Sequence, residues 1–208
     1  MSDLTDIIRI LPPMKSGSEL LSALEVLPEY DNAICDADAP VRLMALSDLY
    51  RVYVPSRMSL EIYSKLYLAL MRSLQKKSTT LATQQKNQNY RAIIQQEYNG
   101  IMGGSDSFTI IGASGIGKSS AISRAITLIT ENRVIEVENP YTNIIPCICV
   151  QCPFDSSVKG LLLEILRKVD EVIGGNYYPN ALRARTTTDM LIGSVSQVAL
   201  NHIGLLVV

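Results

Sequence analysis

The feature that most constrains this chain is a glycine-rich segment near its middle. Residues 112–119 read GASGIGKS and match the pattern G-x-x-x-x-G-K-[ST] in full. In such a loop the glycines permit a tight turn whose backbone N–H groups converge on phosphate oxygens, the lysine reaches the β- and γ-phosphates, and the last hydroxyl ligates Mg²⁺. The pattern therefore predicts a phosphate-binding loop (P-loop), with Lys118 on the phosphates and Ser119 on the metal.

The sequence on either side of the loop fits this interpretation. Residues 108–111 form a short, apolar, β-prone run, which predicts a buried strand. After the loop, apolar residues recur at helical spacing up to Ile129, and a helix that begins at Lys118 directs its free N–H groups at the phosphates. We therefore expect nucleotide binding by the consecutive residues Gly112, Ala113, Ser114, Gly115, Ile116, Gly117, Lys118, Ser119 and Ser120.

Length and composition leave the fold class open within soluble proteins. The chain has 208 residues, of which 47% are hydrophobic, enough for one α/β domain with an N-terminal extension. Its net charge of −1 gives no overall basic field, although a local DNA-binding face remains compatible with it. No apolar run is long enough to span a bilayer, and the first residues are acidic rather than a basic leader. We expect a cytoplasmic protein without membrane association.

Three of the four cysteines lie close together, at Cys147, Cys149 and Cys152, and the fourth is Cys35. In an extended strand, residues 147 and 149 share one face while residue 152 lies on the other, which suits a common metal poorly. We therefore expect buried strand thiols rather than a metal site.

The rest of the chain reads as a helical front followed by an α/β part. Prolines divide residues 1–58 into short elements, and a firmer helix from residue 59 carries an apolar stripe in which Tyr63 and Tyr67 are expected in the core. Residues 75–100 are polar and basic, which indicates either a surface helix with a linker or a contact with a phosphate backbone. The remaining patterns predict a hairpin that residues 133–138 form with the cysteine-rich strand. They also predict helices over 157–173 and 188–202 and a strand over 205–208.

Several short segments, taken in their order and spacing, resemble one known family. They are the Leu-Pro-Pro of residues 11–13, the P-loop with its flanks at 109–120, Cys152 followed by 156–159, and residues 174–177, 196–199 and 202–208. Together they resemble the AAA+ ATP-binding regulators of heteromeric transposons, the TnsC/TniB type. The likeness rests mainly on residues 105–208, and the P-loop is its most specific part.

The resemblance implies a P-loop NTPase of AAA+-like fold, a parallel sheet flanked by helices, with a mostly helical N-terminal extension. We expect a helical region over residues 1–104 and the P-loop core over 105–208. The apolar strand at 205–208 should lie parallel beside 108–111, because the Walker B acids of such proteins follow that strand and face the Mg²⁺. These acids would come after Val208, so we read the chain as a piece that stops before them.

For function, the resemblance implies ATP and Mg²⁺ as ligands, and double-stranded DNA, a transposase and a target selector as partners. It also implies a homo-oligomeric ring or filament on DNA. Nucleotide binding carries over to Lys118 and Ser119, whereas ATP hydrolysis carries over only to the longer protein. The alternative is a signalling or defence P-loop NTPase that acts as a nucleotide-switched binding module. A small-molecule kinase is disfavoured because no lid-like arginine cluster follows the loop, and a GTPase because no Asn-Lys-x-Asp occurs.

Overall fold

The computed structural model describes residues 11–29, 31–77, 107–131, 133–138, 141–183 and 186–208. These residues form a mixed α/β protein that is mostly helical and divides into two compact units. The loop unit contains the described residues of Pro13–Leu66 and Ile110–Ile129, and the sheet unit contains those of Met1–Pro12, Tyr67–Thr109 and Thr130–Val208. The boundary expected after residue 104 lies outside the described residues and stays a prediction.

The loop unit is helical. Its elements are α2 (Gly17–Leu24), the 3₁₀ helix η1 (Asn32–Asp36), α3 (Ala39–Leu46), the 3₁₀ helix η2 (Ser47–Arg51), the first half of α4 (Arg57–Lys77), and α6 (Lys118–Thr130). The short elements that the prolines predicted before residue 58 are thus confirmed. The core of the unit is formed by apolar residues of the three helices that contain buried side chains: Leu20, Leu24, Ile62, Tyr63, Leu66, Ala121, Ala125 and Ile129.

Helix α4 begins where two serines cap each other. Ser56 Oγ accepts a bond from the Ser59 amide at 3.4 Å, and Ser59 Oγ accepts one from the Ser56 amide at 3.1 Å. This reciprocal pair satisfies amides that the first helical turn leaves free. The prediction that Tyr63 and Tyr67 are core residues is confirmed, since they are 1% and 6% exposed. Each hydroxyl bonds to the backbone, Tyr63 with the Lys15 amide and Tyr67 with the Pro12 carbonyl, as buried tyrosines require.

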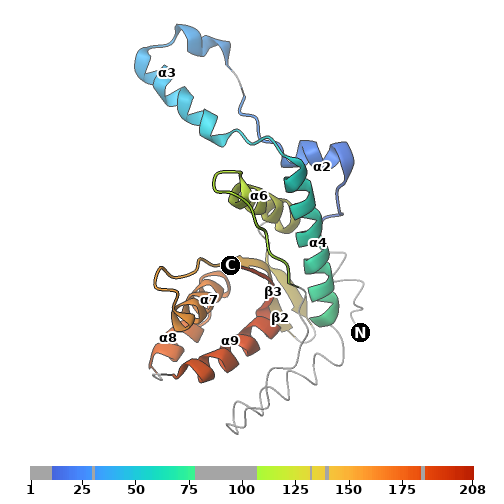
Figure 1. The fold of residues 1–208 in the computed structure, drawn as a ribbon, viewed down its shortest axis with the longest axis vertical. Helices are drawn as coiled ribbons and strands as arrows, with labels where there is room; N and C mark the ends of the chain where they lie inside the picture. Colours follow the sequence, from blue (N-terminus) through green and yellow to red (C-terminus); the bar gives the residue numbers. More distant parts are fainter. Residues whose placement is uncertain (1–10, 30, 78–106, 132, 139–140, 184–185) are drawn as a thin grey trace. The chain divides into compact units, whose positions relative to one another are not determined.

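The sheet unit contains three strands in the order β1 (Ile135–Glu138), β2 (Tyr141–Cys149) and β3 (Ile203–Val207). Strand β1 pairs antiparallel with β2, which confirms the hairpin, and β2 pairs parallel with β3. Helices α7 (Val158–Ile173), α8 (Tyr177–Arg183) and α9 (Thr188–His202) connect β2 to β3. Figure 1 shows α7 and α9 beside the strands, and their apolar residues form one cluster with β2 and β3.

Helices α7 and α9 begin and end within a residue of the predicted bounds, whereas the short α8 was not predicted. Ser157 Oγ accepts a bond from the Gly160 amide at 3.0 Å, and Gly174 ends α7 with a left-handed φ of 70°. Thr187 caps α9 in the same way as Ser157 caps α7. At the other end of α9, Lys77 Nζ donates to the carbonyls of Ala199 and Leu200 at 2.9 and 2.6 Å, which satisfies acceptors of the last turn.

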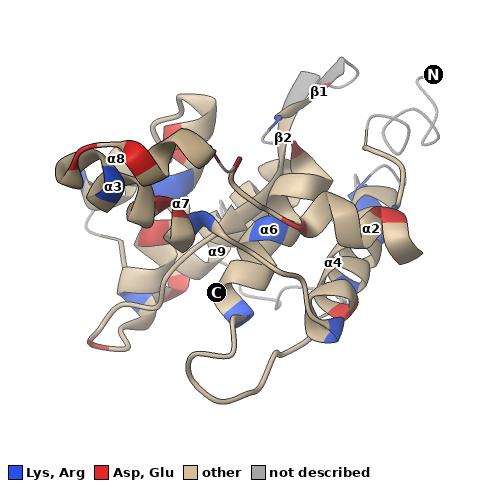
Figure 2. Ribbon diagram, turned by 90° about the horizontal axis from the view of Figure 1, so that it is seen from above, with Lys and Arg blue, Asp and Glu red and all other residues tan. Residues whose placement is uncertain are grey.

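The solvent face of α7 carries acidic and basic residues together (Figure 2). The Arg167 guanidinium pairs with the carboxylates of Glu164 and Glu171, one turn away on either side. Exposed pairs of this kind contribute little to stability, because solvent screens them. We therefore attribute the position of α7 to its buried residues Ile165, Leu166 and Val169.

Two expectations about the sheet are wrong. Residues 108–111 contain no strand, so they form no strand pair with β3, whose partner is β2. The sheet is also mixed rather than parallel, since β1 and β2 are antiparallel. The physical reason is that a strand exists only through its pairing, which an apolar run does not specify by itself. Ile111, expected in a buried strand, is 90% exposed.

Gly204 marks a close approach of β3 to its surroundings. A Cβ at this position would lie 2.7 Å from the Pro146 carbonyl oxygen and 2.8 Å from Leu70 Cδ1 of α4. We expect Gly204→Ala to lower the free energy of unfolding by about 1–3 kcal/mol, measured by urea denaturation followed by circular dichroism. The control is Gly160→Ala in α7. Its Cβ would meet a side-chain atom, the Pro153 ring at 3.0 Å, rather than backbone, and alanine has a higher helix propensity than glycine. Equal stability of the two variants would contradict the tight contact.

Candidate functional site

The P-loop of the loop unit has the backbone that its glycines permit. Gly115 and Gly117 have φ values of 82° and 85°, in the left-handed region that residues with a Cβ rarely adopt. Immediately after Gly117 the chain enters α6, and the Ala121 amide donates to the Gly117 carbonyl at 2.9 Å. The glycines thus turn the chain directly into a helix whose first amides have no intrahelical acceptor.

Helix α6 is held in place by its buried face and by one long-range bond. Ala121, Ala125 and Ile129 are at most 2% exposed, which fixes the helix in the core. Arg124 Nε donates to the Leu24 carbonyl at 3.2 Å, at the end of α2. The start of α6, and with it the P-loop, is therefore supported by packing that does not involve a ligand.

The lysine of the P-loop contacts its own loop. Lys118 Nζ donates to the Gly112 carbonyl at 2.8 Å and to the Ala113 carbonyl at 2.7 Å. These two bonds keep the ammonium group over the loop, where the sequence pattern predicts phosphate oxygens. A bound phosphate would take over some of these donors, because a charged acceptor bonds an ammonium more strongly than a neutral carbonyl does.

A cavity of about 250 Å³ lies between the P-loop and the segment that leads into α4, within the loop unit. From the P-loop side it is lined by Gly115, Ile116, Gly117 and Ser120, and from the facing side by Val52, Tyr53, Val54, Ser56, Met58 and Ser59. It is smaller than the 300–1,000 Å³ typical of ligand pockets, so only part of a nucleotide would fit inside.

Hydroxyl groups hold the facing wall of this cavity in shape. Ser59 is 2% exposed, and its Oγ lies 2.7 Å from Tyr53 Oη and 3.2 Å from Ser56 Oγ. The same serines cap α4, so the first turns of α4 and α6 both border the cavity. Two helix N-termini on one cavity make it electrostatically favourable for an anion.

The structure brings some of the predicted site residues together and not others. Four of the nine line the cavity, namely Gly115, Ile116, Gly117 and Ser120. Gly112, Ala113 and Lys118 form the bonded base of the loop, while Ser114 and Ser119 are exposed and do not line the cavity. Sequence reasoning missed the wall at residues 52–59. The reciprocal serines before α4 give a helix start there, but no local signal indicates what that start faces.

The cysteines lie elsewhere, and the expectation that they are buried is wrong. Cys149 and Cys152 are exposed and Cys147 is half-buried. The apolar residues of β2 that join the core cluster are Ile145 and Ile148, and strand β2 ends at Cys149, so Cys152 lies in the loop beyond it. Within the described ranges, no three His, Cys, Asp or Glu side chains come together as a metal site.

The two strand thiols nevertheless influence each other. A hydrogen bond with Cys147 lowers the pKa of Cys149 to about 7, while the same bond and burial raise the pKa of Cys147. The thiolate is the reactive form, and its fraction rises as the pH rises through the pKa. Cys149 is thus the more nucleophilic of the pair at neutral pH.

We expect the rate at which iodoacetamide alkylates Cys149 to rise with pH through a midpoint near 7, followed by tandem mass spectrometry. Cys147→Ala removes the hydrogen-bond donor and should move this midpoint up toward the usual thiol value of about 8.5. Cys35→Ser serves as the control and should leave it unchanged. An unchanged midpoint in Cys147→Ala would show that the two thiols do not interact.

Comparisons of the chain with protein-family models and with curated proteins found no match. None of the helices in the described part of the chain combines the length and apolar character needed to cross a bilayer.

Proposed function

We propose that this protein binds ATP through the P-loop, as a cytoplasmic P-loop NTPase of AAA+-like fold. The observation that carries the proposal is the passage from the left-handed Gly115 and Gly117 into the N-terminus of α6, beside a cavity bordered by a second helix start. Backbone amides arranged in this way bind phosphate without any change in the fold. The G-x-x-x-x-G-K-[ST] pattern supports the same function independently.

The residues present fit a nucleotide with its magnesium ion. The amides of residues 113–117 would surround the phosphates, and Lys118, whose side chain already bonds to the loop, would donate to them. The exposed Ser119 hydroxyl would take the metal. Tyr53 and Val54, which line the facing side of the cavity, would be available to the rest of the nucleotide.

We further propose, from the resemblance to the TnsC/TniB type, that the protein is an ATP-dependent regulator of DNA transposition. It would assemble as a homo-oligomer on double-stranded DNA and link a target selector to a transposase. The segments that support this reading extend over residues 105–208, in the order and spacing of that family. ATP hydrolysis is proposed only from this resemblance, whereas ATP binding is proposed from the P-loop as well.

Lys118→Ala is expected to weaken Mg-ATP binding by about 1.5–3 kcal/mol, since it removes charge-assisted bonds to the phosphates. Isothermal titration calorimetry measures the effect. Lys159→Ala is the matched control, because Lys159 Nζ likewise donates to a backbone carbonyl, that of Thr186, but lies outside the P-loop. Equal affinity of Lys118→Ala and the unchanged protein would refute the phosphate-binding assignment.

The transposition proposal predicts that Mg-ATP makes the protein assemble on double-stranded DNA, which analytical ultracentrifugation detects as a large sedimenting species. Lys118→Ala should assemble less at the same ATP concentration, since in this proposal the ATP-bound form is the one that assembles. If ATP binds through Lys118 but DNA changes neither assembly nor sedimentation, the nucleotide-switched signalling module replaces the transposition reading.

A further inference from the structure

The loop unit carries an arm whose apolar side chains face water. The arm comprises residues 27–29 and 31–52, and none of the residues in η1, α3 and η2 is buried. Leu43, Leu46 and Leu49 are 68%, 56% and 65% exposed. An antiparallel bridge closes its base, where the Val26 and Tyr53 amides each donate to the other's carbonyl at 2.9 Å. The arm therefore begins and ends at one fixed point.

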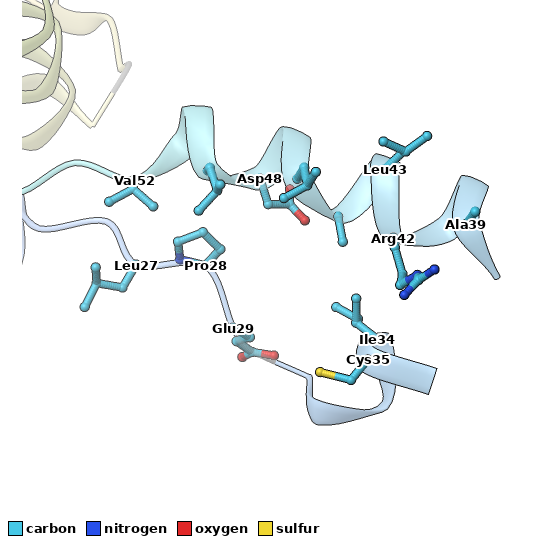
Figure 3. A pocket seen from close by; sticks show the side chains of 13 residues that line it. Leu27, Pro28, Glu29, Ile34, Cys35, Ala39, Arg42, Leu43, Asp48 and Val52 are labelled. Carbon is cyan, nitrogen blue, oxygen red and sulfur yellow. The ribbon is translucent and has the colours of Figure 1, made fainter. Parts of the chain in front are cut away.

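The two sides of the arm enclose a groove of about 890 Å³. Figure 3 shows one wall formed by α3 and η2 and the other by residues 27–29 with Ile34 and Cys35. Ile34 and Arg42 extend toward the space between the walls. The lining is mainly aliphatic, and its charged members are Glu29, Arg42 and Asp48. The arm around this groove buries no side chain of η1, α3 or η2, so no packed core stabilises it.

The arm on its own lacks the contacts that stabilise a short helix. Helix α3 has eight residues, and isolated helices below about 12–15 residues are marginal in water. Apolar stretches of this extent on a protein surface mark sites of interaction. We therefore expect another molecule to cover the apolar side chains of the arm.

The shape and charge of the groove select the occupant. The wall over Ala39–Leu46 and Ser47–Arg51 is roughly 20 Å long by helical rise, which matches about 14 residues of a facing helix. Its leucines stay more than half exposed, whereas a small-molecule pocket buries most of its ligand. The arm also holds five acidic and two basic residues, which disfavours nucleic acid and favours a positively charged partner.

We propose that the arm is a docking site for a basic amphipathic helix of a partner protein. The apolar face of that helix lies in the groove, against Leu46 and Leu49, and its lysines or arginines lie at the rim beside Glu29, whereas Asp48 already pairs with Arg51 of the arm at 3.5 Å. This mode of recognition places an amphipathic helix in a hydrophobic groove and takes its specificity from the flanking charges.

The test uses the whole chain and a fluorescein-labelled peptide of leucine and lysine, about 14 residues long, with leucines at helical spacing. A second peptide has glutamate in place of every lysine. We expect fluorescence anisotropy to show that the chain binds the lysine peptide at least about tenfold more tightly than the glutamate peptide. Equal affinities, or no binding of the lysine peptide, would overturn the proposal.

Leu46→Asp separates docking in the groove from attraction by charge alone. The variant adds an acid, so purely electrostatic binding of the lysine peptide would tighten, whereas docking of its leucines in the groove should weaken by about tenfold. Leu182→Asp on α8 makes the same chemical change at a side chain of similar exposure, 50% against 56%, and should bind normally. Circular dichroism verifies that both variants fold. Unchanged or tighter binding by Leu46→Asp would place the peptide elsewhere and overturn the proposal.

Discussion

One helix, α4, contributes a stripe of buried apolar side chains to both compact units of this protein. The first half of α4 buries Ile62, Tyr63 and Leu66 in the loop unit, and the second half buries Tyr67, Leu70 and Leu74 in the sheet unit. Each fully buried side chain of this size stabilises the fold by roughly 1.5–3 kcal/mol. Both ends of α4 make further contacts. Its first turn lines the P-loop cavity, and Lys77 in its last turn donates to a carbonyl at the end of α9. Losing the stripe would remove buried side chains from both units, although the main cluster of the sheet unit is formed by α7, α9, β2 and β3.

The candidate site depends on backbone more than on side chains. Its glycines hold a conformation that other residues reach only with strain, and its amides come from the start of a helix that the core already fixes. This explains why the loop keeps its shape while Lys118 bonds to carbonyl groups of the loop itself. The main chain of the candidate site is preorganised. The Lys118 side chain is the part that would have to exchange its carbonyl acceptors for a ligand.

The sequence predicted what local chemistry determines. Helices α4, α6, α7 and α9 were predicted because their apolar periodicity and end signals lie within a few residues of each other. The strand at 108–111 was not found, since pairing joins segments far apart and no local pattern selects the partner. The exposure of Cys149 was missed because alternation along a strand does not say which face is covered. The cavity wall at Tyr53 and Ser59 was not predicted, because these residues lie far from the P-loop in sequence and face it only in the folded chain.

The bridge between Val26 and Tyr53 gives the arm a particular evolutionary freedom. Because its two ends are pinned together, the segment between them is a closed loop, and doubling the length of such a loop costs only about 0.6 kcal/mol in closure entropy. Insertions, deletions and exchanges of the arm are therefore inexpensive for the rest of the fold. The residue that closes the arm, Tyr53, also lines the P-loop cavity, so changes within the arm leave that cavity intact only as long as Tyr53 itself is kept.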